Sequence, residues 1–239
     1  MENRIQKKVL ITQSNYIPWK GYFSALSKVD VFVIYDEMQY TKRDWRNRNL
    51  IKTPNGLKWL SIPVEVKGKY FQKINETKVS DKKWNKSHLG ILKQNYNKAK
   101  CYKETIGWVE ELYMNCNFEY LSEINLHFIR EINKYLNIKT EIRFSKDYDL
   151  HKDRNMRLIN LCKDLNATDY YSGPAAKFYM DEDLFGNNNI KVHYFNYSNF
   201  PKYSQLNGEF EHGVSIFDLI FNEGENSKKN LNFGERHSK

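Results

Sequence analysis

Two apolar runs near the start of the chain place the strongest limit on its fold. Residues 8–12 (KVLIT) and 30–36 (DVFVIYD) each indicate a strand, and the second is apolar at every position from 31 to 35. A strand without polar alternation is typical of a parallel sheet that is buried on both faces. Residues 21–28 lie between the runs and have apolar side chains at helical spacing. The pattern therefore predicts a βαβ unit, which winds right-handed in nearly all proteins.

The rest of the chain predicts a hairpin, a helical stretch and a second α/β passage. The hairpin is expected at residues 50–66, with its turn at 53–56 (TPNG), and helical spacing runs from 84 to 136. Further strands are predicted at residues 139–144, 169–173 and 190–197, with a helix at 155–165.

We therefore expect an α/β fold with a Rossmann-like, mostly parallel sheet, a β-hairpin and a helical insertion. Residues 1–224 are predicted to form one domain, with the insertion at about 84–136, because no linker-like stretch divides them. Residues 225–239 are rich in Asn, Glu, Lys and Ser, so they are predicted to form a polar tail and are a candidate for disorder.

The composition limits the class of protein and the class of partner. The 38 Lys and Arg residues exceed the 29 Asp and Glu residues, and the net charge is +9. Such a balance favours phosphorylated small molecules, nucleic acid or anionic membranes, but scattered lysines equally produce an ordinary basic surface. The three cysteines lack Cys-x-x-Cys spacing, which argues against a disulfide framework and a zinc site. Because the chain has no secretory-type apolar run at its start and no apolar run long enough to span a membrane, we expect a cytoplasmic protein. No metal-binding residues are predicted, and whether a metal accompanies a bound diphosphate stays open.

The loop after the first predicted strand is a candidate binding loop. It contains Gln13, Asn15, Tyr16, Trp19 and Lys20, which offer hydrogen bonds, stacking surfaces and one cation. Ligands of open α/β sheets bind beyond the carboxyl ends of the strands, where helix N-termini favour anions. An ordinary βα turn is the alternative, although such turns rarely combine a Trp, a Tyr and a Gln. We expect Gln13, Tyr16 and Trp19 to contact substrate.

Residues 40–49 (YTKRDWRNRN) concentrate four cations in ten residues, with aromatic side chains between them. Guanidinium groups bind phosphate oxygens through paired hydrogen bonds, and neighbouring rings stack on a base or a sugar. This combination suits a nucleotide-linked sugar. A solvated basic loop is one alternative; a nucleic-acid surface is another, but it would spread its cations over several elements. The candidate substrate-binding residues here are Tyr40, Arg43, Arg46, Asn47 and Arg48.

Two residues are candidates for proton transfer. His88 begins a predicted helix, and a histidine titrates near neutral pH, so it can take a proton from an attacking amine or hydroxyl. A structural role is nevertheless the more common one for a lone histidine. Asp36 follows the second strand and lies close in sequence to the arginines, which it can orient, or it can itself take the proton.

Ser172 and Gly173 end another predicted strand and are expected to face the same crevice as the first loop. They would present a hydroxyl and backbone amides to substrate, although a plain turn before a helix is equally consistent with the sequence. The chain contains no Gly-x-Gly-x-x-Gly, P-loop or His-Glu-x-x-His motif. It also lacks a Cys/His cluster at metal spacing. These absences argue against a tightly bound nicotinamide, a P-loop nucleotide and a structural zinc.

Several of these segments together resemble the WbqC-like protein family. The resemblance runs from about residue 8 to residue 224, and the first fifty residues are its most specific part. Lys20 departs from the family pattern, in which an apolar residue is expected. The matching residues are 12–23 (TQSNYIPWKGYF), 30–36 (DVFVIYD), Gln39, Tyr40, 46–49 (RNRN), Trp59, Leu60, Pro63, Val64, Trp84, His88, Tyr171, Ser172, Gly173, Tyr179, Tyr203, Gln205, Phe210 and 215–224 (SIFDLIFNEG).

The resemblance implies a role in building surface polysaccharides such as O-antigen or capsule, and it brings no catalytic residues with it. The first hypothesis is an enzyme that acylates or aminoacylates the amine of a nucleotide-linked amino sugar. His88 would take the proton of the amine, while the amide of Gln13 or the turn at Ser172 and Gly173 would stabilise the developing oxyanion. Two kinds of acyl donor are compatible with the sequence, an acyl thioester and a donor activated by ATP.

The second hypothesis is a non-catalytic protein of the same pathway that binds a sugar nucleotide or serves as a scaffold. Nucleic-acid binding is the least favoured class. Both leading hypotheses predict that replacing Arg46 and Arg48 with alanine abolishes sugar-nucleotide binding.

Overall fold

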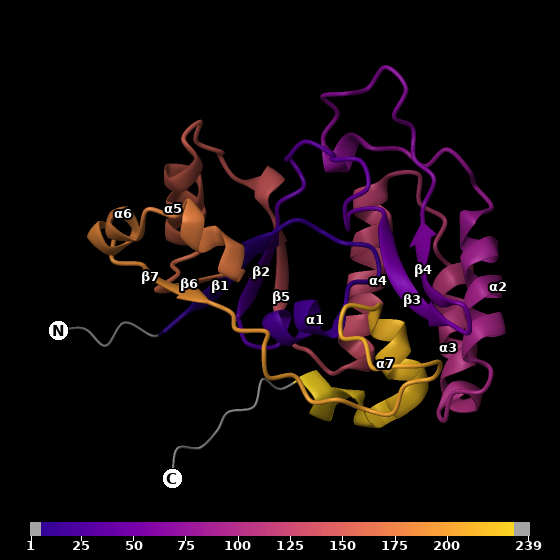
Figure 1. The fold of residues 1–239 in the computed structure, drawn as a ribbon. Helices are drawn as coiled ribbons and strands as arrows, with labels where there is room; N and C mark the ends of the chain where they lie inside the picture. The colour runs from indigo at the N-terminus through magenta and orange to yellow at the C-terminus, as the bar shows by residue number, and fades with distance from the viewer. Residues whose placement is uncertain (1–5, 232–239) are drawn as a thin grey trace, which may run out of the picture.

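The chain folds around a five-stranded sheet. The computed structural model describes residues 6–231, and Figure 1 shows the sheet between two groups of helices. Every neighbouring pair of strands is parallel, in the order β5-β2-β1-β6-β7, which confirms the predicted α/β class and parallel sheet. The strands are β1 (Lys8–Thr12), β2 (Val31–Ile34), β5 (Glu141–Phe144), β6 (Asp169–Ser172) and β7 (Lys191–Tyr194).

The two central strands have the apolar sequences that their positions require. β1 lies between β2 and β6, and β2 lies between β1 and β5, so neither has a free edge. Successive side chains of a strand point to opposite faces. Val9 and Ile11 accordingly pack in one hydrophobic core and Leu10 packs in another, and all four residues of β2 are buried.

Helices cover both faces of the sheet. The smaller core, on the face of Val9, contains residues of α5 (Arg154–Asp164) and α6 (Glu182–Asn187). The larger core, on the face of Leu10, contains residues of α1 (Lys20–Leu26) and α7 (Ile216–Glu223).

The predicted hairpin is present between β2 and β5. β3 (Arg48–Thr53) and β4 (Gly56–Ser61) pair antiparallel, with Thr53 opposite Gly56, so the turn consists of residues 54 and 55. Gly56 has a φ of 96°, a backbone conformation that glycine adopts without a steric penalty.

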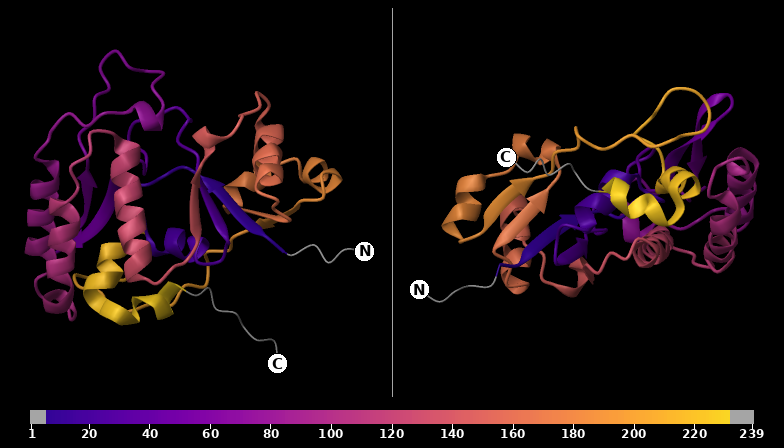
Figure 2. Two further views of the ribbon diagram at one scale, coloured as in Figure 1. Left: turned by 180° about the vertical axis from the view of Figure 1, so that it is seen from behind. Right: turned by 90° about the horizontal axis from the view of Figure 1, so that it is seen from below.

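Three helices follow the hairpin and form the predicted insertion. They are α2 (Trp84–Tyr96), α3 (Tyr102–Met114) and α4 (Leu121–Tyr135), and Figure 2 shows them beside the sheet half of the molecule. The buried faces of these three helices belong to the larger core, together with α1, α7 and the hairpin. The insertion therefore packs through a continuous apolar core against the sheet and the helices that cover it, which we call the sheet half of the molecule. Four 3-10 helices complete the described elements: η1 (Ile74–Glu76), η2 (Ser145–Asp147), η3 (Pro174–Phe178) and η4 (Gly224–Leu231).

The strand order reverses at β1. The chain runs from β1 through α1 to β2, and after the insertion it adds β5 on the same side. α5 then returns it to β6, which pairs with the other side of β1. In open α/β sheets, ligands bind in the crevice outside the carboxyl ends of the strands at such a reversal. The topology therefore places the expected ligand crevice at the ends of β1 and β6.

Part of the polar tail predicted from residue 225 is folded. Residues 224–231 form η4, in which Ser227 and Leu231 are buried, and the hydroxyl of Ser24 in α1 donates a hydrogen bond to the carbonyl of Leu231. Residues 232–239 lie outside the described residues. Within residues 6–231, no helix is long and apolar enough to cross a membrane.

Aromatic rings accommodate Lys20, the residue that departs from the expected apolar pattern. Its side chain is buried, and its Nζ donates to the carbonyl of Pro201 at 2.7 Å. The same atom lies 5.2, 4.9 and 5.3 Å from the ring centres of Phe200, Tyr203 and Phe210. Burial lowers the pKa of Lys20 to about 8, and the cation–π contacts partly replace the water that its ammonium group loses.

Replacing Gly21 with alanine is expected to destabilise the fold. A Cβ on Gly21 would overlap the indole ring of Trp19, which is itself packed against Tyr197 and Phe200 at 5.2 and 5.5 Å between ring centres. The resulting overpacking should lower the free energy of unfolding by about 1–3 kcal/mol, measured by urea denaturation.

The matched control for this substitution is Gly107→Ala in α3. No heavy atom lies within 4 Å of a Cβ at Gly107, so only the gain in helix propensity remains. This control should raise the free energy of unfolding by up to about 1 kcal/mol. An increase of the same size for Gly21→Ala would contradict the packing of the Trp19 ring.

Candidate functional site

A cavity of about 610 Å³ lies at the carboxyl ends of β1 and β6, where the strand order reverses. Its walls come from β1 and the loop after it, α1, the chain after β2, the start of α5 and the turn after β6. The volume falls within the range of roughly 300–1,000 Å³ that is common for small-molecule sites. The lining residues are Leu10, Ile11, Thr12, Gln13, Asn15, Trp19, Tyr22, Ala25, Tyr35, Met38, Arg154, Arg157, Leu158, Tyr170, Ser172, Gly173, Ala175, Ala176, Tyr179 and Tyr197.

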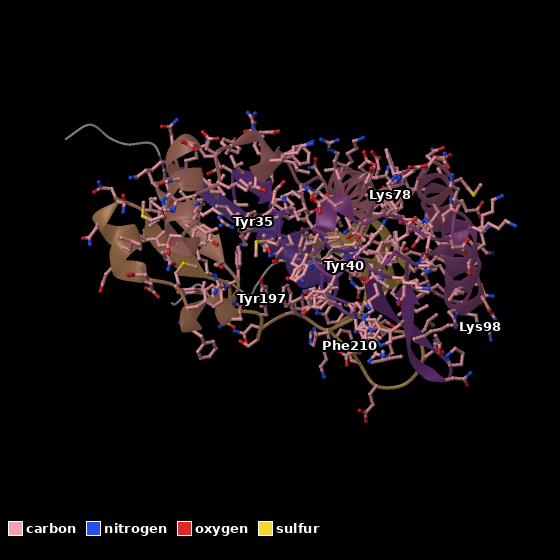
Figure 3. The ribbon with its side chains drawn as sticks, turned by 90° about the horizontal axis from the view of Figure 1, so that it is seen from above. Tyr35, Tyr40, Lys78, Lys98, Tyr197 and Phe210 are labelled. Carbon is pink, nitrogen blue, oxygen red and sulfur yellow. The ribbon has the colours of Figure 1, made fainter. Side chains whose placement is uncertain are left out.

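Arginine and tyrosine side chains make the lining of this cavity cationic and aromatic. The guanidinium of Arg154 lies 3.6 Å from the ring centre of Tyr179, and Arg157 donates from Nη1 to the hydroxyl of Tyr35 at 2.6 Å. Figure 3 shows Tyr35 and Tyr197, two of the lining residues, over the sheet half of the molecule. None of the described lining residues is Asp, Glu or His, so the ionised groups of the lining are cationic. Such a surface suits an anionic ligand with a flat or ring-shaped part.

Buried hydrogen bonds fix the loop between β1 and α1. Asp36 accepts from the backbone N–H and the hydroxyl of Ser14, at 2.8 and 2.7 Å, and from the hydroxyl of Ser122 in α4. Asn49 in the hairpin donates to the carbonyl of Ile17 at 3.0 Å. Ile17 has a φ of 37°, which is unfavourable for a β-branched residue and therefore depends on surrounding contacts. The sheet, the hairpin and the helical insertion thus all hold this loop.

Two residues of the same loop, Gln13 and Asn15, line the cavity, and the amide oxygen of each accepts a hydrogen bond from Arg46. Arg46 donates from Nη2 to Oε1 of Gln13 at 3.1 Å and from Nη1 to Oδ1 of Asn15. Its guanidinium also lies 3.7 Å from the carboxylate of Asp44. Arg46 is not among the described lining residues. Its hydrogen bonds to Gln13 and Asn15 connect it to the lining of the cavity.

Four of the substrate-binding residues predicted from the sequence line the cavity: Gln13, Trp19, Ser172 and Gly173. The structure brings them together because β1 and β6 are neighbours and end at the same edge of the sheet. The expected shared crevice of the first loop and the second turn is therefore present.

Tyr16 and His88 lie outside the cavity, in the larger core. The hydroxyl of Tyr16 is hydrogen-bonded to Nδ1 of His88 at 2.9 Å and to the hydroxyl of Tyr113 at 2.7 Å. His88 packs edge-on against Trp84, with 5.4 Å between ring centres. Burial lowers the pKa of His88 from 6.5 to about 4, so its imidazole is neutral at physiological pH. This geometry gives His88 a packing role among the helices and no contact with the cavity.

The arginines of the segment at residues 40–49 do not line the cavity. Arg43 is exposed, whereas the guanidinium of Arg48 stacks on the ring of Trp59 at 3.9 Å. Asn47 is buried and donates to the carbonyl of Ile62 at 2.8 Å. Tyr40 is also buried, and none of these residues is among the described lining residues of the cavity. Arg46 and Arg48 thus have different partners, the two amides and the ring of Trp59 respectively.

The three hydrogen bonds to Asp36 use both of its carboxylate oxygens, and its side chain is buried. It therefore anchors the loop, and it lines a different, smaller cavity of about 390 Å³ together with Glu37 and Glu123. Within residues 6–231, no group of three or more His, Cys, Asp or Glu side chains is placed to hold a metal ion.

Sequence reasoning missed the two arginines that do line the cavity. Arg154 and Arg157 are three residues apart, so they share one face of α5. A signal for them was available, because a crossover helix that leads into a parallel strand begins at the carboxyl edge of the sheet. This signal places the first turn of α5 at the carboxyl edge of the sheet, and the pairing of β6 with β1 in the structure brings it beside the loop that contains Gln13.

The low pKa of His88 predicts a specific dependence of stability on pH. In the unfolded chain the imidazole titrates near 6.5, whereas in the folded protein its pKa is about 4. As the pH falls from 6.5 to about 4, the unfolded state binds the proton first, so this group lowers the free energy of unfolding by about 3 kcal/mol over that window. Above pH 6.5 its contribution is constant.

The comparison variant for this prediction is His88→Gln, which retains an amide for Tyr16 but does not titrate. Urea denaturation at pH 7 and at pH 4.5 should show a larger loss of stability for the wild-type protein than for His88→Gln. Equal losses would show that His88 is protonated as readily in the folded as in the unfolded state.

Comparison with known proteins places the chain in a family. The model of the WbqC-like protein family matches residues 13–230, a range that includes the cavity loop, the insertion and most of the sheet. The chain is similar to Rv1507c, an uncharacterized protein of Mycobacterium tuberculosis (strain ATCC 25618 / H37Rv), with 48% identity over 218 residues that cover 91% of this chain and 94% of the relative. No solved structure matches. On the extent of the family match, the chain belongs to the WbqC-like protein family.

Proposed function

We propose that this protein takes part in surface-polysaccharide biosynthesis by binding a nucleotide-linked sugar at the carboxyl ends of β1 and β6. The observation that carries the proposal is a cavity at the strand-order reversal whose ionised lining groups, Arg154 and Arg157, are both cationic. The polysaccharide context comes from the family to which the chain belongs.

The cavity matches the parts of such a ligand. A diphosphate carries two or more negative charges, and guanidinium groups bind phosphate oxygens through charge-assisted hydrogen bonds. Arg154 has no carboxylate partner among the described residues. Rings of Trp19, Tyr179 and Tyr197 lie in the walls and can stack on a base or a sugar.

The geometry favours sugar-nucleotide binding over acyl transfer that uses His88 or Asp36 as the base. Acyl transfer to an amine needs an acceptor for the proton close to the attacking nitrogen. His88 and Asp36 are both engaged in buried hydrogen bonds outside the cavity. The described lining contains hydroxyl groups but no carboxylate or imidazole, and hydroxyls are weak bases at neutral pH.

Replacing Arg154 and Arg157 with alanine should weaken the binding of a nucleotide-linked sugar. Isothermal titration of UDP-N-acetylglucosamine and dTDP-glucose into the wild-type protein and each variant tests this directly. Because hydrogen bonds to charged groups contribute about 1.5–3 kcal/mol, each substitution should raise Kd roughly ten- to a hundredfold.

Two other arginines provide the controls. Arg143→Ala removes the same charge as the two cavity variants do, but from the exposed surface of β5. Arg48→Ala removes the side chain that stacks on Trp59. Both should leave Kd within about twofold of the wild-type value, because neither residue lines the cavity. Equal losses for Arg48→Ala and Arg154→Ala would instead support the arginine-rich segment as the phosphate site. Wild-type protein that binds neither nucleotide sugar would count against the proposed function.

A further inference from the structure

Arg46 donates hydrogen bonds to two side chains that line the cavity, but it is not itself among the described lining residues. Its Nη2 donates to Oε1 of Gln13 at 3.1 Å, and its Nη1 donates to Oδ1 of Asn15. The Arg46 side chain is 17% exposed, and Asp44 lies 3.7 Å from its second terminal nitrogen. The backbone of the same residue is also fixed, because its carbonyl accepts from Nδ2 of Asn125 at 2.9 Å.

The chemistry of arginine determines which way the two amides face. A guanidinium group has five N–H donors and no acceptor, whereas an amide side chain has one oxygen that accepts and one amino group that donates. The side of each amide that faces Arg46 must therefore be its oxygen. The amino groups of Gln13 and Asn15 then point away from Arg46, and neither donates a hydrogen bond to another of residues 6–231.

We infer that Arg46 is a positioning residue that holds Gln13 and Asn15 with their amino groups directed into the cavity as hydrogen-bond donors. The inference rests on the proposed function, since it assigns these donors to the ligand of the same cavity. It goes beyond that proposal by naming what they recognise, which is an oxygen acceptor of the ligand. Such an oxygen belongs either to the diphosphate or to the sugar part, for example a hydroxyl or an N-acyl carbonyl.

The first test measures coupling between Arg46 and the two amides. Arg46→Ala should raise the Kd of UDP-N-acetylglucosamine about tenfold, since one or two hydrogen bonds are lost when the amides can rotate. In a Gln13→Ala/Asn15→Ala background, the same substitution should change Kd by less than about twofold. A tenfold effect in both backgrounds, or in neither, would overturn the inference.

Two further variants show whether the geometry of the Arg46 side chain matters, rather than its charge or the folding of the segment around it. Arg46→Lys retains the charge and the aliphatic stem but lacks the fork that reaches both amide oxygens, so it should also lose affinity. Arg48→Ala is the matched control, because it removes a nearby arginine of the same segment that does not contact either amide. A Kd for Arg46→Lys equal to that of the wild type would show that charge alone is needed and would overturn the positioning role.

Isosteric acids identify the source of the recognised oxygen. Gln13→Glu and Asn15→Asp replace each amino group with an oxygen that accepts and repels anions. If the recognised oxygen belongs to the diphosphate, affinity for UDP should fall as much as affinity for UDP-N-acetylglucosamine. If it belongs to the sugar part, the affinity for UDP should fall less. Unchanged affinity for both ligands would overturn the donor assignment.

Nuclear magnetic resonance tests the positioning without any ligand. A hydrogen bond to the oxygen of an amide strengthens its C–N double-bond character, so Arg46 should slow rotation of the amino groups of Gln13 and Asn15. These side-chain signals, assigned from Gln13→Ala and Asn15→Ala, should show faster rotation in Arg46→Ala and no change in Arg48→Ala. This result in a protein that binds no nucleotide sugar would reject the proposed function and retain the positioning role, whereas unchanged rotation in Arg46→Ala would reject the role itself.

Discussion

The buried carboxylate of Asp36 holds together the parts of the molecule that form the cavity. It follows β2, it accepts two hydrogen bonds from Ser14 in the loop after β1, and it accepts a third from Ser122 in α4. Hydrogen bonds to an ionised acceptor are stronger than neutral ones, and their loss would leave a buried charge without partners. Asp36 thus fixes the start of the loop at Ser14, between Gln13 and Asn15, while Asn49 and Arg46 hold the rest of it.

The helical insertion supports the cavity from a distance. His88, the residue of the insertion that the sequence suggested as a base, is buried beside Tyr16 and Tyr113. The hydrogen bonds of Tyr16 to His88 and Tyr113 connect the loop after β1 to α2 and α3. Because a buried polar group must keep its partners, these hydrogen bonds specify how the insertion is seated on the sheet half.

The distribution of charge in the cavity differs from what the overall composition indicates. The net charge is +9, and the lysines that contribute to it are scattered along the chain. In the cavity, by contrast, Arg154 and Arg157 are the ionised groups of the described lining, with no carboxylate beside them. A local excess of cationic donors next to aromatic rings, rather than the total charge, is the basis for expecting a phosphorylated ligand.

The sequence by itself determined the class of fold and many of the helices and strands, because the spacing of apolar residues reflects which face of each element is buried. β1, β2, the hairpin and α5 were predictable in this way, and the loop with Gln13, predicted to bind substrate, lines the cavity. The sequence did not determine which cations meet that loop: Arg43 and Arg48 lie closer to it in the chain than Arg154 and Arg157, yet only the latter pair line the cavity. The tertiary structure decided this, because the order β5-β2-β1-β6-β7 requires α5 to cross the sheet before β6 pairs with β1, and that crossing brings the first turn of α5 to the end of β1.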